Sequence, residues 1–82
     1  MPNPEHWSHE LIPESDGTFR LEILDERDER FPVARQISAD QAKRLLQAIE
    51  AEATRRRYAI AEIIRDPAFM AQTVIAIKRG GR

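Results

Sequence analysis

The longest helical pattern in this sequence runs from Ser38 to Arg65. The stretch contains neither glycine nor proline, and it is dominated by Ala, Leu, Gln, Glu, Lys and Arg, which favour helices. It opens with Ser38, Ala39, Asp40 and Gln41, which match the S-x-x-Q form of a capping box, in which two side chains satisfy backbone amides at a helix start. The sequence therefore predicts a long helix at about 38–65.

Apolar residues recur at helical spacing along this stretch and form one narrow stripe, which is typical of a helix packed on a core. Arg56 and Arg57 project onto the same side and interrupt the stripe. The residues that share the stripe are Ala42, Leu46, Ile49, Ala53, Ile60 and Ile64.

A straight helix over 38–65 is too long for a chain of this size. About 27 residues span about 40 Å at 1.5 Å per residue, whereas a compact chain of 82 residues is only about 30 Å across. The helix must overhang, break, or pack against another chain, and Thr54–Arg57 is where the stripe changes. A straight helix leaves apolar surface uncovered at its far end, which predicts a homodimer through the C-terminal half.

Three segments before this helix predict an antiparallel meander. Apolar and polar residues alternate at about 6–12, 18–26 and 30–37, which is the two-residue period of a strand with one buried face. Turn residues at 13–17 separate the first two segments, and six consecutive charges at 25–30 predict an exposed hairpin tip between the second and third.

The chain after Arg65 predicts a second, shorter helix at about 66–79. Asp66 and Pro67 suit the cap and the first position of a helix. The alternative is a strand at 73–77, because Thr73-Val74-Ile75-Ala76-Ile77 is rich in β-branched residues. The expected architecture is a single α+β domain over 1–82, with frayed ends at 1–5 and 80–82.

Composition indicates the compartment in which the protein acts. The chain has no cysteine, which fits a reducing compartment, and no apolar run of the roughly 20 residues that a membrane span needs, so we expect a cytoplasmic protein with no membrane partner. Residues 1–36 carry nine acidic and four basic side chains (−5), whereas residues 37–82 carry five acidic and nine basic ones (+4). Both charged halves are either solvated surfaces, which is the simpler interpretation, or suited to pair within the chain or with a second copy.

No pattern in the sequence predicts catalysis. His6 and His9 are three residues apart, which places them on opposite faces of a strand and argues against a metal site. The serines lack a nucleophile motif, and glycine occurs only at 17, 80 and 81, so no phosphate-binding loop is present. We expect no enzyme, no cofactor and no bound metal.

The cluster Arg55-Arg56-Arg57-Tyr58 has three interpretations. Arg56 and Arg57 pair with carboxylates of the hairpin or of a second subunit, or the cluster contacts a protein partner, or it binds nucleic acid by phosphate contacts and stacking. The isoelectric point of about 6.1 and the spread of basic residues around the helix argue against nucleic acid.

The function predicted from the sequence is a non-catalytic protein-interaction module, such as an adaptor, inhibitor or regulatory subunit, that acts as a homodimer. The alternative is a regulator that binds nucleic acid through Arg55–Arg57. The hairpin tip at 25–30 is a second candidate surface. The expected partner-binding residues are Arg55, Arg56, Arg57, Tyr58, Ile60, Ile64, Phe69, Met70, Val74 and Ile77.

Overall fold

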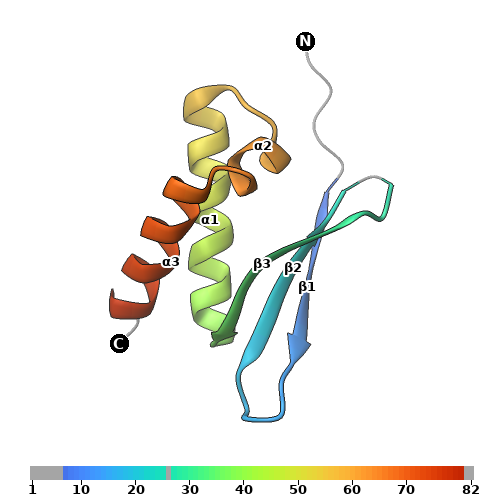
Figure 1. The fold of residues 1–82 in the computed structure, drawn as a ribbon, viewed down its shortest axis with the longest axis vertical. Coiled ribbons are helices and arrows are strands. Elements are labelled where there is room, and N and C mark those ends of the chain that lie inside the picture. The colour runs from blue at the N-terminus through green and yellow to red at the C-terminus, as the bar shows by residue number, and fades with distance from the viewer. Residues whose placement is uncertain (1–6, 26, 81–82) are drawn as a thin grey trace.

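The structure, a computed structural model, describes residues 7–25 and 27–80 and has the predicted α+β architecture. Figure 1 shows a three-stranded sheet with all three helices gathered on one of its sides. The elements in chain order are β1 (Ser8–Pro13), β2 (Phe19–Leu24), β3 (Arg30–Ile37), α1 (Ala39–Arg56), α2 (Ile60–Ile64) and α3 (Pro67–Gly80).

The meander is confirmed, with the sheet order β1-β2-β3 and both pairs antiparallel. Leu11 lies opposite Leu21 in the ladder, and His9 lies opposite Ile23, so the alternation in the sequence separates an inner face from an outer one. Both of the first two strands are shorter than predicted, and the predicted positions 6 and 26 lie outside the described residues.

Strand β3 is irregular, although its predicted bounds of 30–37 are confirmed. Its register with β2 shifts twice, between the partners of Phe19 and Leu21 and between those of Leu21 and Glu22. Gln36 takes a positive φ of 56° near the first shift. Pro32, which has no N–H to donate, also lies in this strand, so β3 has the features of an edge that resists further strand pairing.

The capping box that opens α1 is formed as predicted. The Ser38 hydroxyl accepts a hydrogen bond from the Gln41 amide at 3.0 Å, and the Gln41 side-chain oxygen accepts one from the Ser38 amide at 2.8 Å. Asp40 lies in the first turn, where the helix dipole favours a negative charge.

The prediction of one helix over 38–65 is wrong, because α1 ends at Arg56. Arg57 adopts the left-handed conformation (φ 58°, ψ 38°). Its amide donates to the Thr54 carbonyl at 3.3 Å, and the Tyr58 amide donates to the Ala53 carbonyl at 3.0 Å. These two bonds form a Schellman motif, which ends a helix and turns the chain away. Of the three outcomes expected for an overlong helix, the break at Thr54–Arg57 is the one observed.

The break lets the second half of the predicted helix fold back as α2 against α1 and β3. Ile60 and Ile63 are 5% and 0% exposed, so this segment completes the core of its own chain. The buried core consists of Leu21, Ile23, Ile37, Ala42, Leu45, Leu46, Ile49, Ala53, Ile60, Ile63 and Met70.

The C-terminal element is helix α3, so the alternative of a strand at 73–77 is wrong. Asp66 caps it as predicted, since its carboxylate accepts a hydrogen bond from the Phe69 amide at 3.1 Å. Gly80 belongs to the helix and is not part of a frayed end, whereas the other expected frayed positions, 1–5 and 81–82, lie outside the described residues.

Replacing Arg57 by glycine should stabilise the protein. A residue with a Cβ at positive φ carries a penalty of about 1 kcal/mol that glycine avoids, so we expect Arg57→Gly to raise the free energy of unfolding by about that amount. Gln47→Gly is the matched control, because it places glycine in the exposed interior of α1 and should cost roughly 0.5–1 kcal/mol. Urea unfolding measures both. A destabilised Arg57→Gly would contradict the left-handed stop.

Candidate functional site

The arginine cluster is largely occupied by contacts within the chain. Arg55 donates to Glu52 at 2.6 Å, Arg56 also pairs with Glu52, and Arg56 reaches Asp66 at 2.8 Å. The Arg56 guanidinium lies 5.6 Å from the centre of the Phe69 ring. The interpretation of internal pairing is confirmed for Arg56, but its partners are on α1 and at the start of α3 rather than in the hairpin.

These contacts tie the end of α1 to the start of α3. The hydrogen bond from Arg55, together with that from Arg56, outweighs desolvation and lowers the pKa of Glu52 to about 2, from its ordinary value of 4.5. The Arg56 guanidinium likewise lowers the pKa of Asp66. Arg56 therefore helps to hold the chain reversal together, whereas Arg55 pairs with Glu52 of its own helix and its side chain stays exposed.

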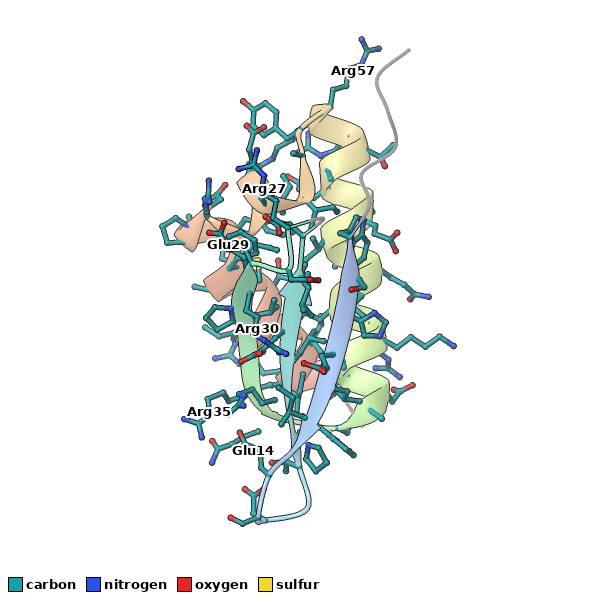
Figure 2. All side chains as sticks on the ribbon, turned by 90° about the vertical axis from the view of Figure 1, so that its right-hand side faces the viewer. Glu14, Arg27, Glu29, Arg30, Arg35 and Arg57 are labelled. Atoms are coloured by element: carbon teal, nitrogen blue, oxygen red, sulfur yellow. The ribbon has the colours of Figure 1, made fainter. Side chains whose placement is uncertain are left out.

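Arg57 and Tyr58 are exposed members of the predicted contact turn, as is Arg55, which pairs within its own helix. Figure 2 shows Arg57 extending from the far end of α1, and Tyr58 is 51% exposed. Lys78 and Arg79 lie in the last turn of α3, at the opposite end of the molecule in Figure 1. These exposed basic residues do not converge on one face.

The apolar residues predicted to bind a partner lie mostly against the core of the same chain. Ile60 and Met70 are buried, at 5% and 9% exposure. The half-buried ones, which pack against this core, are Ile64, Phe69, Val74 and Ile77. The expectation of a dimer through the C-terminal half depended on a straight helix that left these side chains uncovered, and the chain reversal removes that reason.

The predicted hairpin tip is organised by one of its own carboxylates. Asp25 accepts hydrogen bonds from the amides of Arg27 at 2.8 Å and Glu29 at 2.9 Å, and Asp28 takes a positive φ of 61°. Arg30, the last of the six charges, belongs to β3 and contributes to the sheet instead.

The outer face of the sheet carries a network of charges. Arg30 pairs with Glu10 and with Glu22, the latter at 2.8 Å, and the Arg20 Nε lies 3.3 Å from a Glu22 oxygen. Figure 2 shows Arg30 on the side of the sheet away from α1. The hydrogen bond from Arg30 to Glu10 raises the pKa of Arg30 above its ordinary value. Because these charges largely satisfy one another, this face has little charge left to attract a ligand.

A groove between β1 and α1 is apolar, unlike the charged outer face of the sheet. Its volume is about 370 Å³, and its floor is apolar, with Ala42 and Leu46 buried and Leu11 half-buried. The complete lining is His9, Leu11, Ala39, Ala42, Lys43, Leu46, Gln47 and Glu50. Ala39 and Ala42 are small, which leaves room above the floor.

Two opposite charges stand on the rim of this groove without a partner. Lys43 and Glu50 are exposed, and neither forms an ion pair or a side-chain hydrogen bond with any part of the chain that the structure describes. They are seven residues apart on α1, so about 10 Å of helix separates them, too far for them to pair with each other. Other exposed charges, such as Lys78 and Arg79, also lack an ion pair within the described residues, but Lys43 and Glu50 are of opposite sign and line the same groove.

The groove also follows an open edge of the sheet. Within residues 7–25 and 27–80, β1 pairs with β2 alone, and Figure 1 shows it as the outermost strand. The other edge strand, β3, contacts α2 and α3 and contains two bulges and Pro32. An open strand edge presents unpaired amides and carbonyls, so β1 is the edge at which a further strand can pair.

The sequence pattern does not predict this groove. The pattern placed Ala42 and Leu46 correctly on the buried side of the helix, but it gave no sign that a groove runs over them beside β1. The one clue was the Lys43–Glu50 spacing, which puts opposite charges two helical turns apart on one face.

Comparisons with known proteins give no further indication, since no family model, no curated protein and no solved structure matches the chain. None of the helices in the described ranges is long and apolar enough to cross a membrane. The same residues contain no group of three or more His, Asp or Glu side chains placed to hold a metal ion.

Proposed function

We propose that this chain is a non-catalytic protein-interaction module and that the groove between β1 and α1 is its contact surface. The observation that supports this proposal is the unpaired opposite charges of Lys43 and Glu50 on the rim of an apolar groove. Two unpaired charges of opposite sign on one rim are suited to fix the direction of an incoming segment.

The mode of binding that fits this surface is strand addition. An extended segment pairs its backbone with the open edge of β1 and places alternate apolar side chains over Leu11, Ala42 and Leu46. The backbone bonds supply affinity, whereas the groove and its rim charges select the sequence. An acidic side chain of the segment meets Lys43, and a basic one meets Glu50.

A module of this kind acts as an adaptor, an inhibitor or a regulatory subunit, because it binds a partner and catalyses no reaction on it. The absence of cysteine supports action in a reducing compartment, and we place the protein in the cytoplasm as part of this proposal.

Nucleic-acid binding has weaker support than the protein contact. Arg55 and Arg56 are engaged by Glu52 and Asp66, and Arg57 lies at the opposite end of the molecule from Lys78 and Arg79. We expect no affinity for generic DNA or RNA at low salt. Binding that falls steeply with added salt and is lost in Arg57→Ala would favour the nucleic-acid alternative instead.

Selection from a displayed library of random peptides tests the protein contact. We expect enriched peptides to alternate apolar residues between an acidic and a basic position. Lys43→Glu should weaken their binding at least about tenfold, since it creates a like-charge contact. Lys78→Glu makes the same charge change far from the groove and should leave affinity unchanged. An absence of enrichment, or peptides indifferent to Lys43→Glu, would refute the proposal.

A further inference from the structure

The rim charges of the groove are complementary to themselves under a two-fold rotation. If two α1 helices run antiparallel about a point between Leu46 and Gln47, residue 43 of one copy faces residue 50 of the other. The two-fold therefore creates two Lys43–Glu50 pairs between copies, whereas neither residue has a partner in its own chain within the described residues.

We propose that the natural occupant of this groove is a second copy of the same chain, docked with α1 antiparallel to α1 and with the two β1 edges adjoining. This inference depends on the proposed contact surface and names its partner. It places the dimer along α1 and the β1 edge, away from the C-terminal surface that the sequence suggested.

The chemistry of the face agrees with such a partner. The exposed Gln47 lies beside the axis, with the buried Leu46 beneath it, and Ala39 meets the exposed Thr54 of the other copy. The small side chains of Ala39 and Thr54 allow two helices to approach to the usual 8–10 Å. A two-fold contact uses the same patch on both copies, so a charge pair at the rim is formed twice.

Charge exchange tests this arrangement in the full-length chain. Lys43→Glu places a second carboxylate against Glu50 of the other copy at two symmetric sites, and Glu50→Lys places two ammonium groups together in the same way. We expect light scattering after size exclusion to give twice the 9.5 kDa chain mass for the unaltered protein, and each single variant to raise the dissociation constant at least about tenfold.

Combining the two changes separates this geometry from other dimers. The double variant K43E/E50K restores both pairs and should dimerise like the unaltered protein. An equimolar mixture of the two single variants should form a heterodimer, because each carries the charges that the other lacks. Lys78→Glu is the control for net charge and should dimerise normally. Lys43 and Glu50 are exposed, so the thermal midpoints of the monomers should stay close to one another.

A protein that is monomeric at all concentrations, a dimer indifferent to the single changes, or single variants that fail to combine on mixing would overturn the inference. If the protein is monomeric but peptides selected on the groove still lose binding in Lys43→Glu, the second copy is wrong and the proposed contact surface stands. If those peptides also fail, both proposals fall.

Discussion

Replacing Ile63 by alanine should lower the free energy of unfolding by about 3 kcal/mol. Ile63 is fully buried in α2, and truncating such a side chain removes apolar burial and leaves a cavity. A chain of this length has a total free energy of unfolding of roughly 4–12 kcal/mol, so this loss is a large fraction. Urea unfolding followed by circular dichroism measures it.

Ile75→Ala is the matched control for this prediction. The substitution is the same, but Ile75 is 51% exposed on α3, and its loss should change the free energy of unfolding by less than about 0.5 kcal/mol. Equal small effects at the two positions would mean that residues 60–64 do not pack on their own chain, and the fold described above would then be incorrect.

The second large effect should appear when the protein is acidified. The pKa of Glu52 is about 2 in the folded chain, held down by hydrogen bonds from Arg55 and Arg56, against an ordinary value of 4.5. A carboxyl whose folded pKa is depressed stabilises the fold fully above its unfolded pKa, and this contribution disappears as the pH falls through the folded pKa. We therefore expect stability to drop between about pH 5 and about pH 2.

Glu52→Gln should remove much of this dependence. The variant lacks the ion pairs, so it should be less stable than the unaltered chain at neutral pH, and the two should converge towards about pH 2. Glu50→Gln, two residues earlier on the same helix, changes an unpaired carboxylate and should leave the pH profile unchanged in a monomeric sample. A constant difference between Glu52→Gln and the unaltered chain at every pH would argue against the Glu52 contacts.

The meander and the start of α1 could be predicted because their causes are local. Alternation in strands and the S-x-x-Q motif depend on neighbouring residues only, so β3 and the capping box are found as expected. The cap and first position of α3 at Asp66 and Pro67 could be recognised for the same reason.

The end of α1 could not be located by the same rules. A left-handed stop is normally marked by glycine or asparagine, and here the position is Arg57, which carries no such mark. The stop is held by distant contacts instead, since Arg56 reaches Asp66 across the reversal and Ile63 fills the core. The mismatch between helix length and chain size gave a break as one of three outcomes, and the interruption of the apolar stripe indicated Thr54–Arg57 as its place.

The candidate site was harder to predict than the fold. The groove exists because, in the described part of the chain, no further strand covers α1 beyond β1, and a sequence pattern does not show which surfaces stay uncovered in the tertiary structure. The arginines at 55 and 56 suggested a binding surface in the sequence, yet both pair with Glu52 in the preceding turn and Arg56 also pairs with Asp66. Lys43 and Glu50 are ordinary helix-surface residues in the sequence. Their significance comes from the open edge of β1 beside them, which is a property of the tertiary structure.

The most direct test of the chain reversal is an isotope-filtered nuclear Overhauser experiment on a mixture of ¹³C-labelled and unlabelled chains. The fold described above predicts that the Ile63 methyl groups contact α1 and β3 of the same molecule, and that helical amide contacts stop after Arg56. Unbroken helical contacts from Thr54 through Ala59, or Ile63 contacts found only between different molecules, would contradict it.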